Sequence, residues 1–348
     1  MQAFRTSLTG RVNLPDSTQR RKSGFSDGHS THAKENALGK SVWCRGFECN
    51  RPLQQSFLIG PLCETANLHK CLECSLPKRR SPSENCGHGI IAMSSFKLSK
   101  WYFDCVTDLG EVVIVYTGVA QWRKFRLHYS STLETTKEAI IEHRSLQPQI
   151  GPVISGPKIW WRSKALRVDG EWETSSRAVS ATIYRSPEGV IEWNCLMPMA
   201  RARIGGRRGL GYAEHLTMTI PPWRLPIHTL RWGRFTSAST WMTWIDWQGE
   251  YSRRIVYVNG EVIECQMIGD ECIEGSDGVR LSMDRSLVLR DGLLGKTALS
   301  RMPVIGKMFP SRLTEMAESK WRSRARMERS GRTDVEGWAI HEKVSWPH

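Results

Sequence analysis

The sequence lacks the features that mark several large classes of protein. No run of about 18 apolar residues is present that could cross a bilayer, and the N-terminus has no apolar stretch of the secretory-signal type. The motifs G-x-S-x-G and H-E-x-x-H and the phosphate-binding P-loop are also missing. We therefore expect a cytoplasmic protein that is neither an integral helical membrane protein nor a common hydrolase.

The net charge of +14 is the strongest bias in the composition. Such a charge suits anionic partners such as nucleic acid or a membrane surface. No zinc-finger, RNP or helix-turn-helix pattern accompanies it. An ordinary basic surface is the simpler interpretation, so we expect no nucleic-acid partner. Nucleic-acid binding through the basic N-terminus and residues 320–329 is a minor alternative.

Residues 1–92 differ in composition from the rest of the chain. They are rich in Ser, Gly, Asn, Lys and Arg without periodicity, and they hold one of the fifteen tryptophans, Trp43. Disorder is the expectation for such a segment. Aromatic alternation begins just after Met93. We hypothesise that Met93 is the true start and that residues 1–92 are an upstream extension wrongly assigned to the protein.

Six of the ten cysteines lie in this N-terminal segment. Cys71 and Cys74 have the C-x-x-C spacing of zinc ligands, with His69 and His88 nearby, and Cys44 and Cys49 would be the second pair. Unpaired thiols are the interpretation that we favour, so no metal and no other cofactor is expected. The remaining cysteines have no ligand spacing and are expected to be buried thiols: Cys105, Cys195, Cys265 and Cys272.

From residue 93 onward, short β-rich runs alternate with turn sequences. Residues 101–106 and 111–117 predict a hairpin, and Asn259-Gly260 is a strong hairpin turn. Residues 132–144 have the most helical composition, which favours a short helix or an irregular crossing. Residues 315–329 are basic and predict a helix or an exposed edge strand.

Many short antiparallel strands predict an all-β fold of the barrel or sandwich kind. Residues 93–348 are too many for one small barrel. We therefore expect two tandem antiparallel β-barrels, residues 93–205 and 206–348, divided near the Gly/Arg-rich loop at residues 203–209. A closed barrel of roughly eight strands can hold one small ligand.

The stretch at residues 209–220 carries the clearest chemical signal. If it is a strand, its side chains alternate between two faces. Glu214 then lies on the apolar face, which also presents Tyr212, Leu216, Met218 and Ile220. The opposite face is Gly211, Ala213, His215, Thr217 and Thr219.

The last element repeats this arrangement. Glu342 shares an apolar face with Trp338, Ile340, Val344 and Trp346, whereas His341 faces the other way. Asp104 and Asp246 are weaker acidic candidates on other strands. We expect His215 and His341 to be surface or cross-strand histidines.

A carboxyl group in an apolar pocket has a raised pKa and can act as a general acid. Such an acid suits protonation of a carbon–carbon double bond, because aromatic faces favour the resulting cation. Water could capture the cation, or an internal nucleophile could close a ring. The structural alternatives are that Glu214 and Glu342 pair with Arg231, Arg234 or Arg285, or that both glutamates face solvent. The candidate aromatic faces are Trp223, Trp232, Trp241, Trp244 and Trp247.

Several of these blocks resemble the hydroxyneurosporene synthase (carotenoid 1,2-hydratase) superfamily over residues 95–346. The blocks are Trp101-Tyr102-Phe103-Asp104, residues 211–215, Trp232-Gly233-Arg234-Phe235 with the strand at residues 241–247, and Gly337-Trp338 with Glu342. The resemblance implies two lipocalin-type barrels and water addition to an isoprenoid double bond, or ring closure and pericyclic chemistry in related lipocalin-like branches. This sequence departs from the carotenoid enzymes in two ways. It is shorter, and its acidic block contains Glu214 whereas theirs is rich in aspartate.

The resulting hypothesis is a hydratase or cyclase for a large apolar substrate, isoprenoid or polyene. The alternative is a non-catalytic carrier of a lipophilic ligand. The expected partner is a lipophilic small molecule, with peripheral membrane contact as one route of access. The expected catalytic acids are Glu214, Glu342 and Asp104. The expected ligand-binding residues are Tyr212, Trp223, Trp232, Trp241, Trp244, Trp247, Arg231 and Arg234.

Overall fold

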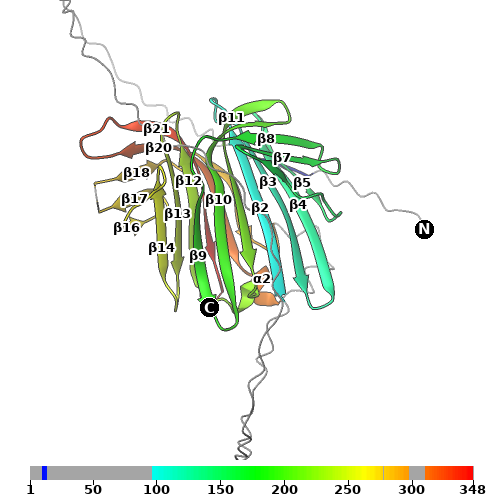
Figure 1. Ribbon diagram of the computed structural model, residues 1–348. Coiled ribbons are helices and arrows are strands. Elements are labelled where there is room, and N and C mark those ends of the chain that lie inside the picture. The colour runs from blue at the N-terminus through cyan, green and yellow to red at the C-terminus, as the bar shows by residue number, and fades with distance from the viewer. Residues whose placement is uncertain (1–9, 14–95, 277, 298–309, 348) are drawn as a thin grey trace, which may run out of the picture. The chain divides into compact units, whose positions relative to one another are not determined.

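The structure is a computed structural model that describes residues 10–13, 96–276, 278–297 and 310–347 (Figure 1). These residues form an all-β fold of two curled antiparallel sheets, or half-barrels. The prediction of an all-β protein with two antiparallel units is confirmed. The predicted cysteine cluster and the hypothesis about Met93 lie outside the described residues. Within the N-terminal segment, the structure describes Gly10–Asn13 as strand β1.

The first sheet has eleven strands in the order β1-β5-β4-β3-β2-β11-β10-β8-β7-β6, with β9 paired to β10. Its strands after β1 are β2 (Phe96–Val106), β3 (Val112–Trp122), β4 (Phe125–Thr135), β5 (Ala139–Ser145), β6 (Val153–Ser155), β7 (Lys158–Ser163), β8 (Val168–Glu173), β9 (Val179–Ser186), β10 (Gly189–Ile204) and β11 (Arg207–Met218). The predicted hairpin at residues 101–117 is confirmed as β2 and β3, which pair from Phe96 opposite Trp122 to Val106 opposite Val112.

The second sheet has ten strands in the order β15-β14-β13-β12-β21-β20-β18-β17-β16, with β19 paired to β20. Its strands are β12 (Thr229–Thr236), β13 (Trp241–Gln248), β14 (Arg253–Val258), β15 (Glu261–Val262), β16 (Cys265–Ile268), β17 (Cys272–Gly275), β18 (Arg280–Met283), β19 (Leu287–Leu293), β20 (Ala317–Glu328) and β21 (Val335–Ser345). In the described ranges, the short helices η1 (Pro222–Arg224) and α2 (Ser311–Thr314) lie outside the sheets. Among the described residues, no helix is long and apolar enough to cross a membrane.

The described strands of each sheet form an open path with two ends, so pairing among them does not close either half-barrel. The chain passes from the first sheet to the second between Met218 and Thr229. The predicted boundary at residues 205 and 206 therefore falls between β10 and β11, which pair within one sheet. The division into two domains stays a prediction, since all the described residues belong to one compact unit.

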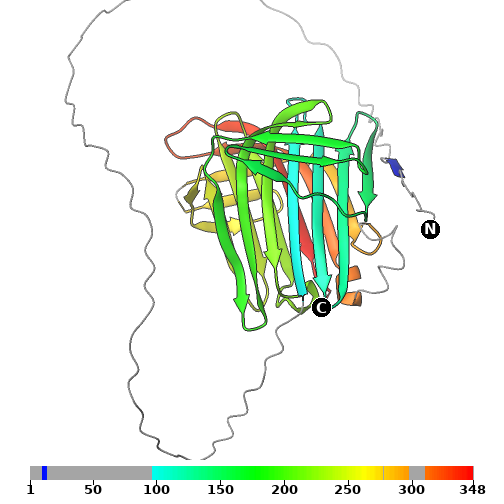
Figure 2. The same ribbon diagram turned by 45° about the vertical axis from the view of Figure 1, so that its right-hand side comes forward.

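Three apolar clusters account for most of the core. One lies within the first sheet and includes Phe103, Trp161 and Trp172, and another lies within the second sheet and includes Phe235 and Trp244. The third, which we call the central cluster, contains side chains from both sheets. In Figure 2, strands of the first sheet stand in front of the red and orange strands of the second, as expected for sheets that face each other. Central-cluster members include Tyr102, Trp193, Tyr212, Trp232, Trp241 and Ile340.

Strand β2 shows how the alternation of a strand supplies two cores at once. Phe103 and Cys105 point into the first half-barrel, whereas Tyr102 and Val106 point into the central cluster. Successive side chains of a strand face opposite sides of its sheet. Residues on both faces of this strand are therefore withdrawn from water, which explains its run of buried residues at the C-terminal end.

The prediction of a short helix or irregular crossing at residues 132–144 is wrong. This stretch completes β4 and forms β5, which pair with each other. Leu133 is buried, and the Thr135 hydroxyl oxygen accepts a hydrogen bond of 2.7 Å from the Val112 backbone N–H. The partner strand β3 thus fixes an extended conformation, because tertiary context outweighs a weak helical propensity.

The prediction for residues 315–329 is also wrong. Strand β20 occupies this stretch and pairs with β21 on one side and with β18 and β19 on the other. It is therefore an interior strand rather than a helix or an edge. Alternation puts Lys320, Arg324 and Arg326 on one face of β20, but Lys320 is buried whereas Arg324 and Arg326, nearer the end of the strand, are exposed.

Candidate functional site

Strand β11 places Glu214 in the space between the two sheets. Its pairing with β2 is unbroken from Leu210 to Met218, so the alternation predicted from the sequence holds. Tyr212 joins the central cluster, whereas Ala213 packs inside the first half-barrel. The register shifts near this site lie on the neighbouring strand β10, between Cys195 and Ala200.

Three hydrogen-bond donors converge on one oxygen of the Glu214 carboxyl. The Trp193 Nε1 atom lies 2.5 Å from Oε2, the Tyr212 hydroxyl oxygen 2.7 Å and the Trp232 Nε1 atom 3.1 Å. Residues from β10, β11 and the facing strand β12 therefore meet at this carboxyl. No described residue forms a hydrogen bond with Oε1, the second carboxyl oxygen.

The environment of Glu214 favours the protonated carboxyl group. Burial raises its pKa above the ordinary value, and the donors Trp193 and Tyr212 oppose this effect only in part. Lys100 is the cation that acts to lower this pKa, and no ion pair with Glu214 forms in the described part of the chain. Glu214 is thus a carboxyl group held by neutral donors rather than by an arginine.

Aromatic rings surround this carboxyl group on the side of the first sheet and on the side of the second. The ring centroids of Tyr212 and Trp232 are 5.8 Å apart, and those of Tyr102 and Trp232 are 4.9 Å apart, both in edge-to-face contact. Such contacts fix the orientation of each ring. The site therefore combines a protonatable group with rigid aromatic walls.

Asp104, the second predicted acid, lies in an ion pair. Both it and Arg234 are fully buried, and the Arg234 Nη2 atom is 2.6 Å from the Asp104 Oδ1 atom. The Tyr102 hydroxyl donates a further bond of 2.9 Å to Asp104 Oδ2. Burial acts to raise the pKa of Asp104, and the Arg234 guanidinium acts to lower it. This pairing joins β2 to β12 and suits a structural role.

Glu342, the third predicted acid, also pairs with a cation, but with a lysine instead of an arginine. Its carboxylate bonds the buried Lys320 ammonium, which in addition lies 2.5 Å from the Tyr116 hydroxyl oxygen. Burial acts to lower the pKa of Lys320, but the nearby carboxylates, Glu342 first among them, raise it overall. Glu342 is thus part of a charged cluster and differs from Glu214.

This charged cluster extends to β19 in the second sheet and to β5 in the first sheet. Arg290 on β19 bonds Glu318 on β20 at 3.2 Å and reaches across to Glu142 on β5 at 2.6 Å. Burial acts to raise the pKa of Glu318, but Arg290 and Lys320 lower it to about 2. Asp104–Arg234, Tyr116–Lys320 and Glu142–Arg290 are thus three cross-sheet polar contacts.

The predicted arginine partners of the glutamates bind other residues. Arg231 bonds Asp270 at 2.8 Å and approaches Asp246, so it does not line the Glu214 site. Arg285 pairs with Glu271. The structural alternative in which these arginines neutralise Glu214 or Glu342 is therefore wrong.

The tryptophans that were predicted to bind the ligand do not all lie in one cluster. Trp241 and Trp247 lie in the central cluster, whereas Trp244 packs in the core of the second half-barrel. Trp232 contacts Glu214 directly. Trp223, on η1, is partly buried against the central cluster. Alternation along β13 puts Trp244 on the face opposite to Trp241 and Trp247. The sequence-based grouping of the three tryptophans overlooked this signal.

The sequence-based hypothesis missed Trp193 and Lys320 as neighbours of the candidate acids. Trp193 lies on β10, the strand before β11, but the sequence does not fix the register in which these two strands pair. Lys320 lies in the basic stretch whose fold was predicted wrongly. The missing information in both cases is the register of pairing between consecutive strands, β10 with β11 and β20 with β21.

The two histidines next to the glutamates face away from the central cluster, as predicted. His215 lies 2.8 Å from the Ser99 hydroxyl and stacks on Trp101. His341 lies 2.8 Å from the Ser323 hydroxyl and is buried, which lowers its pKa to about 4. Neither belongs to the Glu214 site.

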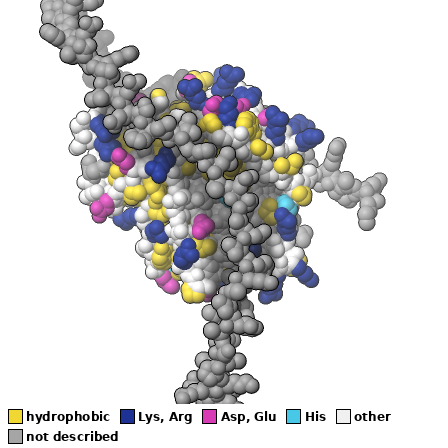
Figure 3. Space-filling view, in the orientation of Figure 1, with side chains coloured by type: hydrophobic (Ala, Val, Ile, Leu, Met, Phe, Trp, Pro, Cys, Tyr) yellow, Lys and Arg dark blue, Asp and Glu magenta, His cyan; other side chains and the backbone are white. Residues whose placement is uncertain are grey.

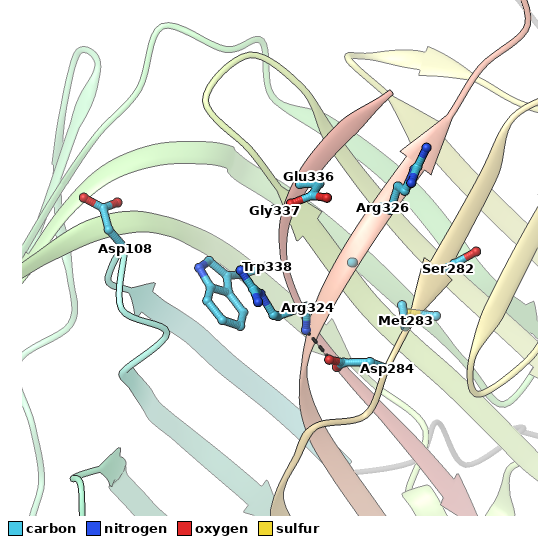
Figure 4. Close-up of a pocket in the computed structure, with 10 residues that line it drawn as sticks. Asp108, Ser282, Met283, Asp284, Arg324, Arg326, Glu336, Gly337 and Trp338 are labelled. Carbon is cyan, nitrogen blue, oxygen red and sulfur yellow. Dashed lines mark hydrogen bonds between the residues drawn. The ribbon is translucent and has the colours of Figure 1, made fainter. Parts of the chain in front are cut away.

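Four cavities, of about 340 to 570 Å³, lie elsewhere in the described part of the chain, and Glu214 lines none of these four. The largest of these four is shown in Figure 4 and has charges of both signs on its wall. There the Arg324 backbone N–H bonds Asp284, and the Arg324 guanidinium lies 5.8 Å from the Trp338 ring. Because basic and acidic side chains alternate around this cavity, it does not resemble the apolar setting of Glu214.

No group of His, Cys, Asp and Glu in the described part of the chain could hold a metal ion. Cys105 and Cys195 are buried free thiols, as predicted, whereas Cys265 and Cys272 are only partly buried.

Comparisons with known proteins found likenesses only among solved structures. No family model and no curated protein matches the chain. A crystal structure of CghA with Sch210972 is 9% identical, with a TM-score of 0.44, over 72% of this chain and 88% of that one. Kievitone hydratase from Nectria haematococca is 14% identical, with a TM-score of 0.41, over 72% and 89% of the two chains. Likeness at this level does not establish function, which has to rest on the site.

Proposed function

We propose that the protein protonates a carbon–carbon double bond of a large apolar substrate, isoprenoid or polyene, and promotes its hydration or cyclisation. The observation that carries this proposal is the buried Glu214 carboxyl, with three neutral donors on Oε2 and a raised pKa. A carboxyl that remains protonated near neutral pH can serve as a general acid.

The donors define which oxygen carries the proton. Indole N–H groups can only donate, so Trp193 and Trp232 require lone pairs on Oε2. The transferable proton is therefore on Oε1. When it moves to a substrate carbon, the carbon–carbon π bond supplies the electron pair of the new C–H bond, and Glu214 becomes a carboxylate. The same three donors then stabilise this negative charge.

The aromatic walls act on the positive charge that forms at the neighbouring carbon. The faces of aromatic rings attract cations, most strongly when water is excluded. Trp193, Tyr212 and Trp232 are all buried beside Glu214. Water that adds to the cation and then loses a proton gives the hydrated product, whereas attack by an internal nucleophile gives a ring. In either case Glu214 regains a proton.

Partly exposed apolar residues at one end of the sheets support an approach path for the substrate. Glu214 retains 9% of its surface. Toward the end of the sheets where η1 lies, the inward side chains pack against the central cluster but are only partly buried. We call these residues the rim: Leu98, Leu216, Trp223 and Leu230. An apolar rim next to a buried acid suits a lipophilic ligand.

Lipid extraction of the purified protein followed by mass spectrometry would first identify a bound apolar molecule. Incubation of candidate polyenes in D₂O then tests proton transfer, since the proposal requires deuterium on the carbon that accepts the proton. Glu214→Gln should reduce turnover by roughly 100-fold to 10,000-fold, the usual contribution of a general acid. Glu192→Gln, an exposed glutamate on the neighbouring strand β10, is the matched control.

The same experiments distinguish an enzyme from a non-catalytic carrier of a lipophilic ligand. If Glu214→Gln binds the ligand and turns it over as the unchanged protein does, acid catalysis by Glu214 is wrong. If the unchanged protein binds an apolar ligand tightly but no polyene acquires deuterium, the carrier function replaces the enzymatic one.

A further inference from the structure

The hairpin turn between β3 and β4 is basic and aromatic and extends into solvent. Residues 121–126, with the sequence Gln-Trp-Arg-Lys-Phe-Arg, are all exposed. Trp122 exposes 36% of its surface and Phe125 exposes 51%. We call residues 122–126 the tip. Large aromatic side chains at such exposure are withdrawn from water only by a partner.

The two aromatic residues of the tip face the same way. Trp122 is directly opposite Phe125 in the β3–β4 pairing, so both side chains lie on one side of the hairpin. Alternation along β3 puts Trp122 on the same face as Tyr116, a member of the central cluster. The apolar inward face of this hairpin therefore continues from the core to an exposed end.

The basic residues of the tip have no acidic partner. No carboxylate in the described part of the chain pairs with Arg123, Lys124 or Arg126. The Arg123 guanidinium lies 5.6 Å from the Trp122 ring and the Lys124 ammonium 5.9 Å from the Phe125 ring. Two cations, Arg123 and Lys124, thus lie beside the two exposed aromatic rings, and Arg126 adds a third positive charge to the tip. Figure 3 shows that elsewhere on one face basic and acidic side chains are interspersed.

The tip stands next to the rim. The rings of Trp122 and Trp223 are 5.3 Å apart in edge-to-face contact, and Trp223 also contacts Phe96 at the start of β2. The Arg312 guanidinium of α2 donates to the Trp223 carbonyl oxygen at 3.4 Å. The hairpin end and α2 lie at the same end of the sheets in Figures 1 and 2.

We propose that the tip docks the protein on an anionic lipid surface. Tryptophan and phenylalanine favour the interface between headgroups and acyl chains. Lysine and arginine are attracted to anionic headgroups, with a contribution from each cation near the surface. The combination of both residue kinds on one turn meets both requirements. Docking itself is independent of the catalytic proposal, whereas delivery of an apolar substrate to the adjacent rim rests on it.

Vesicle flotation of the full chain tests the docking without any substrate. The vesicles contain phosphatidylcholine with about one third phosphatidylglycerol, a composition chosen to give an anionic surface. We expect Arg123→Glu/Lys124→Glu and Trp122→Ser/Phe125→Ser each to weaken binding at least about tenfold, since the first reverses two charges and the second removes the inserted apolar area.

Matched controls come from other exposed turns. Lys164→Glu/Arg167→Glu reverses two charges in the turn between β7 and β8, where Arg167 has the same left-handed backbone as Arg123, with φ values of 54° and 53°. Ile150→Ser/Val153→Ser removes exposed apolar surface of 83% and 57% relative exposure from another loop and strand. Both controls should bind vesicles as the unchanged protein does. Circular dichroism confirms that each variant is folded.

The proposal is overturned if the tip variants bind as tightly as the controls, or if pure phosphatidylcholine vesicles bind the unchanged protein equally well. A single-stranded DNA oligonucleotide serves as the other polyanion. If the tip variants lose affinity for DNA but keep affinity for vesicles, the tip is a nucleic-acid surface and the lipid assignment is wrong. Loss of vesicle binding alone supports docking on lipid, whatever the result with Glu214→Gln.

Discussion

The Asp104 carboxylate and the Arg234 guanidinium form two parallel hydrogen bonds that join the two sheets. The Arg234 Nη2 atom lies 2.6 Å from Oδ1, and its Nε atom lies 2.9 Å from Oδ2. This two-point geometry fixes orientation as well as distance. Arg234 also donates to the Thr236 hydroxyl at 2.8 Å, which holds the guanidinium on its own strand. The pair therefore sets how β2 and β12 face each other near Glu214.

Breaking this pair should destabilise the fold strongly. Asp104→Asn leaves the Arg234 charge buried without a carboxylate, and such losses typically cost about 3 to 5 kcal/mol. Asp104→Leu/Arg234→Met removes both charges and should be less destabilising than the single change. Urea unfolding measures both. A single variant as stable as the double variant would contradict a direct interaction between these two side chains.

The pH dependence of stability should reveal the buried Glu214 carboxyl. Its pKa in the folded protein is raised from the ordinary 4.5, so between 4.5 and the raised value the folded chain holds a proton that the unfolded chain has released. Folding stability should therefore fall as pH rises through this window. Glu214→Gln should flatten that part of the profile in urea unfolding. An unchanged slope would mean that Glu214 is ionised in the folded protein.

The donors on Glu214 should matter more for turnover than for folding. Trp193→Phe removes one bond to the carboxylate that forms after proton transfer, and a hydrogen bond to a charged group contributes about 1.5 to 3 kcal/mol. A decrease in kcat of roughly tenfold to 100-fold is expected on that scale. Trp346→Phe, in the same cluster but without a bond to Glu214, is the control. Equal effects of both changes would favour a packing role for Trp193.

His341 should make the protein acid-sensitive. Burial lowers its pKa from 6.5 to about 4 in the folded protein. Above pH 6.5 both folded and unfolded states are neutral at this residue. As pH falls from 6.5 to 4, only the unfolded chain gains the proton, so stability falls by up to about 3 kcal/mol. His341→Gln, whose amide can still bond Ser323, should lose less stability between pH 7 and pH 4.5. Parallel profiles for both proteins would contradict this expectation.

The sequence by itself determined the strand pattern and the faces of the key strands. Alternation put Tyr212 and Glu214 on one face of β11 and His215 on the other, because side chains of a strand point alternately to its two sides. The hairpin of β2 and β3 followed from two β-rich runs around a turn. These are local properties, and an unbroken register in β11 preserved them.

Only the tertiary structure decided which side chains meet across the two sheets. Trp232 meets Glu214 from the facing sheet, whereas Trp193 meets Glu214, and Lys320 meets Glu342, through the register in which consecutive strands pair. Residues 132–144 became strands because β3 pairs with β4 and β4 pairs with β5, and these ladders supply the hydrogen bonds that a helix would have made internally. Periodicity fixes the face of a strand but not its neighbours, and the neighbours determine whether a carboxyl group is a buried acid or half of an ion pair.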